Sequence, residues 1–507
     1  MLIYLSFLST QTWTLLLLFL GLLVVYGYWP YGVFKKLGIP GPKPVLFFGN
    51  MLNYTKGFHN FDWECFQKYG KIWGIYDSRQ PVLCITDTEL IKTILVKECY
   101  SIFTNRRDFG LNGPMYDSLF NAEDEDWKRI RSVLSPSFTS GRLKEMFGII
   151  KTHSRNLVNS MKKDADLAKA SDTKEYFGAY SMDVVTSTSF SVDIDSLNNP
   201  KDPFVTNIKK MLKFDLLNPL FLIVGMSTFF PFMAPILDKM NFALFPISVT
   251  DFFYAALQTI KAERVTNSRK NRVDFLQLMV DSQAVLMTIY VLHLGLNDHE
   301  ILSQAMIFIF AGYETSSATM NFLFYLLATN PDTLKILHDE IDEVFPDKAE
   351  VQYEALMQME YLDCVINETL RLYPPAARLE RVCKKTVEIS GVIIPKGIVV
   401  MVPTYALHRD PELWTEPENF KPERFNKENK DTIDPYSYMP FGMGPRNCIG
   451  MRFALISIKL AIVELLQRFT ITTCAETEIP LELDSLGLMA PKRPIKLQLV
   501  PRPLGRS

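Results

Sequence analysis

A cysteine at the start of an apolar helix is the residue of this chain best suited to do chemistry. Phe441–Gly450 reads FGMGPRNCIG, and the apolar periodicity after it predicts a helix from about Met451 to Phe469. Cys448 is therefore expected at a helix N-terminus, where the helix dipole and unpaired N–H groups favour a thiolate. The small residues allow the backbone to approach a flat ligand closely. A lone cysteine is more often an inert buried thiol, so the spacing around Cys448 decides its interpretation.

A second candidate segment lies between two apolar runs. Residues 311–316 read AGYETS and place Glu314 and Thr315 within a predicted helix. Gly312 weakens that helix, and the Thr315 hydroxyl can bond the carbonyl four residues back, so we expect a kink and a local groove. Taken alone, the segment also fits a helix whose glutamate faces water.

Two charged motifs lie further along the chain. Glu368 and Arg371 are spaced i,i+3 on one predicted helix face, and the run Pro422–Phe425, which contains Arg424, follows some fifty residues later. By themselves these residues predict no more than an exposed ion pair worth a few tenths of a kcal/mol.

Together these motifs identify a family resemblance. Phe-x-x-Gly-x-Arg-x-Cys-x-Gly is the haem-ligand signature of the cytochrome P-450 superfamily, and the chain resembles that superfamily over essentially its whole length. It most resembles family 3, subfamily A, of vertebrates, including residues 36–42, 405–411 and 444–455. The resemblance implies haem b with Cys448 as the axial iron ligand. Thiolate ligation favours O–O cleavage, which implies a monooxygenase using O2 and NADPH-derived electrons rather than an oxygen carrier.

The resemblance also implies residue roles. Glu314 and Thr315 guide protons and ordered water to dioxygen, and Glu368, Arg371 and Arg424 form a structural cluster behind the haem. The residues implied to hold the haem carboxylates are Arg106, Trp127, Arg131, Arg381 and Arg446. Those implied to line the substrate pocket are Phe109, Phe214, Phe245, Phe310 and Ala376. Such aromatic, largely apolar walls predict broad specificity for lipophilic steroids and xenobiotics.

The elements that must position these residues are predicted to be mainly helical. At 507 residues the chain is long enough for several domains, but no linker or repeat interrupts it after residue 45. Short strand-like runs lie at about Val82–Ile85, Val387–Ile389 and Ile398–Val402. The resemblance implies one mainly α body with a small β-sheet region, the cytochrome P-450 fold, spanning residues 51–507.

The N-terminal segment predicts a membrane anchor. No charged residue occurs in Met1–Phe34, and Trp13–Trp29 is apolar over about a bilayer's thickness, so residues 1–30 predict one transmembrane helix. A cleaved signal peptide is the alternative, but a basic leading region and a small-residue cleavage pattern are missing. Lys35 and Lys36 then predict a cytosolic catalytic domain. Residues 31–50 form a Pro-rich hinge, and the resemblance implies the endoplasmic reticulum membrane.

Composition excludes several other functions. The net charge of −2 gives no general basic field for nucleic acid, and seven scattered cysteines without a CxxC argue against a disulfide scaffold or a zinc cluster. Because no nucleotide-binding motif is present, electrons must come from a partner, which the resemblance implies is NADPH-cytochrome P-450 reductase, sometimes with cytochrome b5. The candidate contacts for that partner are Lys128, Arg129, Lys144 and Arg452.

Two apolar segments complicate this interpretation. Residues 204–253 hold 10 Phe, and the uncharged run Leu216–Leu237 predicts either a shallow dip into lipid or core packing. Ala284–Leu296 is apolar where relatives carry a polar loop, so it is a liability for folding and activity. Two alternative functions stay open: a haem-thiolate enzyme that rearranges peroxides, and a haem-binding or membrane interaction protein without turnover.

Overall fold

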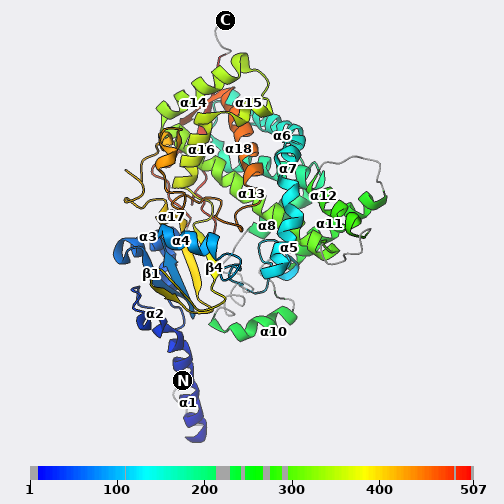
Figure 1. Cartoon of the computed structure of the whole chain (residues 1–507). Helices are drawn as coiled ribbons and strands as arrows, with labels where there is room; N and C mark the ends of the chain where they lie inside the picture. The colour runs from blue at the N-terminus through cyan, green and yellow to red at the C-terminus, as the bar shows by residue number, and fades with distance from the viewer. Residues whose placement is uncertain are drawn as a thin grey trace, which may run out of the picture.

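The structure is a computed structural model that describes residues 10–108, 110–212, 229–240, 242, 246–266, 274–287, 295–484 and 487–503. Helices make up most of this described part, and the strands labelled β1 and β4 lie together at its lower left (Figure 1). The longer helices are α1 (Thr10–Tyr28), α3 (Phe58–Tyr69), α5 (Asp124–Leu134), α6 (Ser140–Asp166), α7 (Thr173–Phe190), α8 (Pro203–Leu212), α11 (Ile247–Thr266), α12 (Phe275–Met287), α13 (Asp298–Thr329), α14 (Pro331–Val344), α16 (Glu360–Leu372) and α18 (Met451–Leu466). The shorter ones are α2 (Val33–Lys36), α4 (Thr88–Lys92), α10 (Ala234–Lys239), α15 (Tyr353–Met357) and α17 (Thr404–Leu407).

The main sheet joins distant parts of the chain. Its strand order is β1 (Ile72–Asp77), β2 (Gln80–Ile85), β7 (Val399–Pro403) and β4 (Arg378–Val382). β1 and β2 form a hairpin, β2 pairs with β7 in parallel, and β4 pairs with β7 in antiparallel. The second sheet has the order β3 (Ser171–Asp172), β9 (Lys496–Pro501), β8 (Phe469–Thr473), and β5 (Val387–Ile389) pairs with β6 (Val392–Ile394).

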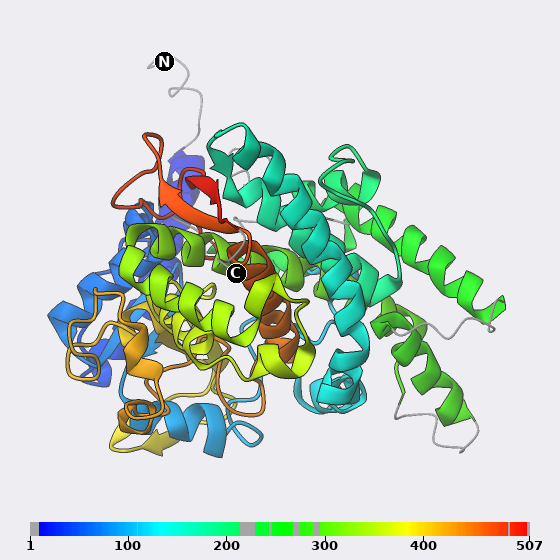
Figure 2. The same cartoon turned by 90° about the horizontal axis from the view of Figure 1, so that it is seen from above.

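Helix α13 runs through the middle of the helical part (Figures 1 and 2). Its sequence is apolar on nearly every face, which suits a helix surrounded by others, and most of its side chains are buried. Asn297 begins it with a capping box, since its side chain accepts from the Glu300 N–H while the Glu300 carboxylate accepts from the Asn297 N–H. Helices α7 and α18 pack against it and share its apolar core.

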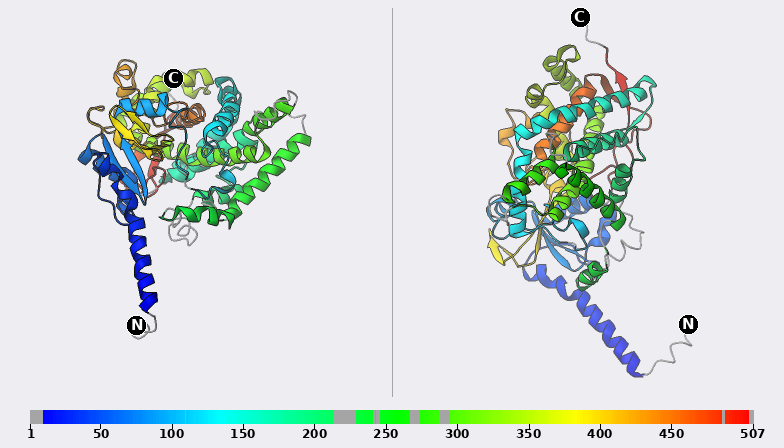
Figure 3. Two further views of the ribbon diagram at one scale, coloured as in Figure 1. Left: turned by 60° about the horizontal axis from the view of Figure 1, so that its bottom comes forward. Right: turned by 90° about the vertical axis from the view of Figure 1, so that its right-hand side faces the viewer.

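The helix α1 projects away from the body (Figure 3). Within the described ranges one helix, Thr10–Lys36, is long and apolar enough to cross a membrane, and only 6% of its apolar window is buried. A long apolar helix without protein around it is stable in lipid rather than in water. This supports a membrane-anchored protein.

The predicted fold class, mainly α with small sheets, is confirmed. The three predicted strand runs correspond to β2, β5 and β7. The predicted helix Met451–Phe469 was too long at its end: α18 stops at Leu466, because Phe469 pairs with Pro501 as the first residue of β8. Of the apolar segment Ala284–Leu296, the backbone of 284–287 continues α12, Leu296 is buried in the core, and 288–294 lie outside the described residues.

Candidate active site

The loop before α18 is held by its own backbone and by close packing. The Cys448 N–H donates to the Phe441 carbonyl at 2.8 Å, and Asn447 N–H donates to Gly444 O at 3.1 Å. Gly444 has φ +75°, and a Cβ there would lie 2.0 Å from the Leu95 carbonyl oxygen. Only glycine allows the loop to approach the segment after α4 so closely. Cys448 is thereby fixed one turn before the N-terminus of α18.

Cys448 is exposed, although much protein surrounds its sulfur atom. Burial raises the pKa of its thiol, while the N–H groups of Gly450 and Met451 and the cations Arg131 and Arg106 act to lower that pKa. The expected N–H groups and charges are therefore present, but burial outweighs them in the isolated chain. A metal ion bound to this sulfur would add the positive charge that favours a thiolate.

Three arginines converge beside this loop. Arg446 donates to the backbone carbonyls of Thr104 and Ala122, and Arg106 donates to Phe120 O at 3.1 Å. Arg381 is buried, and its Nη1 donates to Glu380 O at 2.7 Å. The Nε atoms of Arg381 and Arg446 are buried without a hydrogen-bond partner among the described residues. In the described part of the chain, no ion pair joins Arg106, Arg381 or Arg446 to a carboxylate.

Burial and mutual repulsion disfavour charge in this cluster. They lower the pKa of Arg446 to about 9 and that of Arg106 well below its ordinary value, and burial lowers the pKa of Arg381. Guanidinium groups held together without an acid predict an anionic occupant, since a carboxylate accepts from them in charge-assisted hydrogen bonds.

Trp127 and Arg131 adjoin this cluster from α5. Arg131 donates from Nη1 to Asn447 O and from Nη2 to Asn447 Oδ1, both at 2.9 Å, so it ties α5 to the cysteine loop. Trp127 is buried, and the Arg446 guanidinium stacks over its ring with Cζ 4.9 Å from the centroid. All five residues expected to face the haem carboxylates thus lie in segments that meet at this loop.

The segment expected to handle oxygen lies on α13. Thr315 Oγ1 donates to Ala311 O at 2.8 Å, and Glu314 pairs with Lys174 of α7 at 3.5 Å. Helix α13 is helical without interruption from Asp298 to Thr329, and the kink expected at Gly312 stays a prediction. Gly312 also allows close packing, since a Cβ there would lie 2.5 Å from Val185 Cγ2 of α7. Ala311 is exposed in a helix that is otherwise mostly buried, so this turn borders open space.

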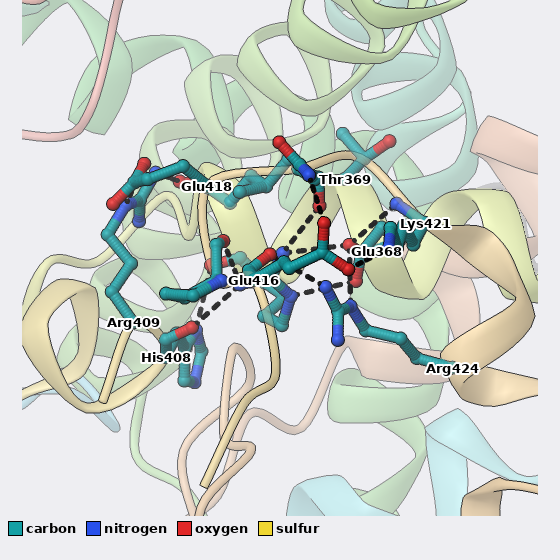
Figure 4. A network of polar contacts seen from close by, with 12 residues as sticks. Glu368, Thr369, His408, Arg409, Glu416, Glu418, Lys421 and Arg424 are labelled. Carbon is teal, nitrogen blue, oxygen red and sulfur yellow. Dashed lines mark hydrogen bonds and ion pairs between the residues drawn. The ribbon is translucent and has the colours of Figure 1, made fainter. Parts of the chain in front are cut away.

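The charged motifs form a buried network (Figure 4). Glu368 and Arg371 are both 0% exposed and make a bidentate pair at 2.7 and 2.8 Å. Arg371 also donates to the carbonyls of His408, Pro417 and Asn419, which satisfies every N–H of its guanidinium group. Arg424 Nε lies 3.2 Å from Glu368 Oε1.

His408 also belongs to this network, although no role is predicted for it from the sequence. Met439 N–H donates to His408 Nε2 at 3.0 Å, so the ring proton is on Nδ1, which donates to Arg371 O at 3.2 Å. Burial and the Arg371 charge lower the pKa of His408 to about 3, so the ring is neutral. Because Gly442 N–H donates to Met439 O, His408 links the ion pair to the cysteine loop. The sequence feature that could have indicated this role is the segment 405–411, in which His408 directly precedes Arg409.

The residues predicted to line a substrate pocket are described only in part. Phe310 precedes Ala311 on α13 and packs at the edge of the core, and Ala376, whose carbonyl accepts from Thr404 Oγ1 at 2.6 Å, follows α16. Phe109, Phe214 and Phe245 lie outside the described residues.

Comparison with known proteins gives the class to which this fold and site belong. The family model for Cytochrome P450 matches residues 39–499, so the chain belongs to the cytochrome P450 family and is a P450 monooxygenase. Among its relatives, Cytochrome P450 3A27 of Oncorhynchus mykiss is 68% identical over 99% of this chain and 97% of its own length. Cytochrome P450 3A40 of Oryzias latipes is 69% identical over 98% and 99%, and Cytochrome P450 3A12 of Canis lupus familiaris 57% over 97% of each chain.

The haem that this family implies fits the residues present. Cys448 offers a reachable sulfur ligand, and Arg106, Arg131, Trp127, Arg381 and Arg446 offer donors to the anionic edge of a porphyrin. The buried Nε atoms of Arg381 and Arg446, which have no partner among the described residues, are donors that a porphyrin carboxylate would satisfy.

Proposed function

We propose that this protein hydroxylates or dealkylates lipophilic substrates such as steroids and xenobiotics, using O2 and electrons that NADPH supplies through a reductase. The observation that carries the proposal is the accessible Cys448 beside buried arginines that lack a carboxylate. Haem b, when bound, activates O2 for insertion of one oxygen atom into a C–H bond. Cys448 is proposed to ligate its iron, and the five basic and aromatic residues beside the loop to hold its carboxylates. Phe310 and Ala376 are proposed to line the pocket with Phe109, Phe214 and Phe245.

We assign proton delivery to Glu314 and Thr315. The Thr315 hydroxyl lies on the turn that borders open space, and Glu314 is held by Lys174, whose side chain is half exposed. An acid with one neighbour in water and a hydroxyl beside it can carry protons from solvent to the reacting centre. The chain's own part in the reaction is therefore to bind the substrate, exclude bulk water and admit protons at these two side chains.

Replacing Thr315 tests this assignment. In Thr315→Ala, the hydrogen peroxide released per substrate oxidised should rise about threefold or more. Without the hydroxyl that directs the proton, reduced dioxygen leaves as hydrogen peroxide before its O–O bond is cleaved. The measurement is the ratio of peroxide to product with purified reductase. Thr329→Ala removes the same kind of hydroxyl, bonded to Tyr325 O, at the far end of α13, and should leave that ratio unchanged. Equal ratios in both variants would contradict the role of Thr315.

The electron donor is proposed to be NADPH-cytochrome P-450 reductase, with cytochrome b5 as a second partner. Lys128 and Lys144 carry partly exposed charges that pair with Glu125 and Glu354, and Arg452 lies near Ser140. Arg129 is turned inward to the buried Glu300 and to Gly295 O, so it is the weakest of the candidate contacts. High salt should slow reduction by the partner.

The membrane is proposed to be that of the endoplasmic reticulum, with α1 as a single-pass anchor and the catalytic domain in the cytosol. Lys35 and Lys36 on the body side of α1 support this orientation. Lipophilic substrates dissolve in the bilayer, so an anchored enzyme meets them at high local concentration.

Replacing the proposed iron ligand tests the whole assignment. Reduced wild-type protein with carbon monoxide should show the absorption band of a thiolate-ligated haem, and Cys448→Ser should lose that band and the NADPH-dependent oxidation of a steroid panel. Cys474→Ser changes a cysteine remote in sequence from the loop and should keep both. Turnover with organic peroxides but without NADPH and reductase would instead indicate a peroxide-rearranging enzyme.

A further inference from the structure

The C-terminal end of the anchor helix α1, here called its foot, comprises Tyr26 and Gly27. It packs against Arg79, residues 45–48 and Phe229–Phe230, which together are called the cradle. Tyr26 stacks on Phe230 with ring centroids 5.9 Å apart and an interplanar angle of 11°. Its hydroxyl donates to Phe229 O at 3.3 Å. These contacts join two parts of the chain that are about 200 residues apart, and neither residue belongs to the site described above.

The turn between β1 and β2 closes the cradle from a second side. The Arg79 guanidinium lies over the Tyr26 ring, with Cζ 3.5 Å from the centroid, and its Nε donates to Tyr26 O at 3.1 Å. A cation packed on an aromatic face and bonded to the same residue's carbonyl fixes the ring in one orientation. Tyr26 is thus held between Arg79 and Phe230.

The loop 45–48 forms the third side. Gly27 is the buried residue of α1, and a Cβ there would lie 2.5 Å from Leu46 Cδ1, so α1 passes very close to this loop. Phe48 contacts Phe229 edge-on at 5.3 Å, and Phe47 contacts Phe230 at 6.4 Å.

The segment held by this cradle carries an exposed apolar stripe. Phe232, Ile236 and Met240 are spaced four residues apart and are 64%, 56% and 62% exposed, while Leu237 between them is buried. Four-residue spacing puts side chains on one face of a helix. Helix α10, which carries Ile236, lies at the same end of the molecule as α1 (Figure 1).

We infer that the foot of α1 is an interaction surface for Phe229–Met240, and that this contact sets how the stripe meets the bilayer that α1 spans. The anchor helix then keeps one orientation relative to the body, because its last turn packs against the body. Its orientation is transmitted through Tyr26 to Phe229 and Phe230, and from there along the chain to the stripe. This inference uses the membrane anchoring proposed above, but the contact itself can be tested without a membrane.

Hydrogen exchange tests the contact. In full-length holoprotein in detergent, backbone amides of 229–240 should exchange about tenfold faster in Tyr26→Ala than in wild type, since the stacking and cation contacts are lost. Tyr28→Ala removes an exposed tyrosine of the same helix, whose ring contact is with Tyr31, and should leave these amides unchanged. Tyr26→Phe, which loses only the hydroxyl bond, and Arg79→Gln, which lies outside the anchor, should give smaller increases. Equal exchange in Tyr26→Ala and Tyr28→Ala overturns the inference.

Photocrosslinking tests the consequence in a bilayer. A benzoylphenylalanine at position 236 should form adducts with phosphatidylcholine in nanodiscs, and the Tyr26→Ala change should lower their yield severalfold. The same probe at the exposed Lys335 of α14, at the opposite end of the body, should give none. An unchanged yield at 236 after Tyr26→Ala, or equal yields at 236 and 335, overturns the inference. Failure of the protein to enter nanodiscs would overturn the membrane anchoring instead, and the detergent experiment would still decide the contact.

Discussion

Arg371 can remain charged in the interior because its whole guanidinium group is bonded. Its partners are the Glu368 carboxylate and three backbone carbonyls, one of which belongs to His408. A buried ion pair contributes little net stability, but loss of one partner leaves an uncompensated charge costing about 3 to 5 kcal/mol. The network therefore fixes geometry around the cysteine loop rather than adding much stability.

The neutral His408 ring is the link in this network that a substitution can probe most cleanly. His408→Leu leaves Met439 N–H and Arg371 O unpaired in the interior, which should lower the free energy of unfolding by roughly 3 kcal/mol and reduce haem content. His408→Gln keeps an acceptor and a donor at similar reach and should lose clearly less. Urea unfolding and the haem-to-protein absorbance ratio measure both effects. Indistinguishable Leu and Gln variants would show that packing, not hydrogen bonding, is what matters there.

At the scale of elements, the cysteine loop depends on how closely it meets the segment after α4. Gly444→Ala adds a Cβ 2.0 Å from Leu95 O at a positive φ, so we expect a loss of about 3 kcal/mol and of bound haem. Gly391→Ala has a similar φ of +79° but open space around it, and should cost only about 1 kcal/mol. Urea unfolding compares the two variants. Equal losses would mean that backbone conformation, and not the approach to Leu95, requires glycine at position 444.

Some of these elements could be predicted from the sequence and others could not. Period and composition were sufficient for α1, β2 and the start of α18, because each is a local pattern with a clear end. The end of α18 was missed, since Phe469 leaves the helix only because β9 from the C-terminus offers it a partner. The arginine cluster and the His408 bridge were likewise not readable from spacing, because Arg106, Arg381 and Arg446 meet only after folding.

At the scale of the whole molecule, buried histidines predict instability in acid. Burial lowers the pKa of His59 and His338 to about 4 and that of His408 to about 3, against 6.5 for a free histidine. Below pH 6.5 the unfolded chain therefore binds more protons than the folded one, and stability falls as pH falls. The three together should cost roughly 4 kcal/mol between pH 7 and 5.5.

Removing one of these histidines isolates the effect. His338→Gln, on α14 and away from the cysteine loop, should reduce the loss of unfolding free energy between pH 7 and 5.5 by about a third. Burial raises the pKa of carboxyl groups such as Glu340 and Glu464, so these groups increase the unfolding free energy as pH falls. They do so equally in wild type and in His338→Gln, and their effect cancels when the two are compared. The same pH dependence in variant and wild type would show that His338 does not contribute to the loss of stability in acid.

The parallel pairing of β2 with β7 also bears on how the protein is made. During synthesis the β1–β2 hairpin leaves the ribosome early, yet its neighbour, with Val82 opposite Val399, follows only after more than 300 further residues. Until then one edge of that hairpin has no partner, and a two-stranded hairpin alone is marginally stable in water. Translation must therefore nearly finish before β2 can pair with β7. Until then the nascent chain exposes the unpaired edge of β2, which chaperones can bind.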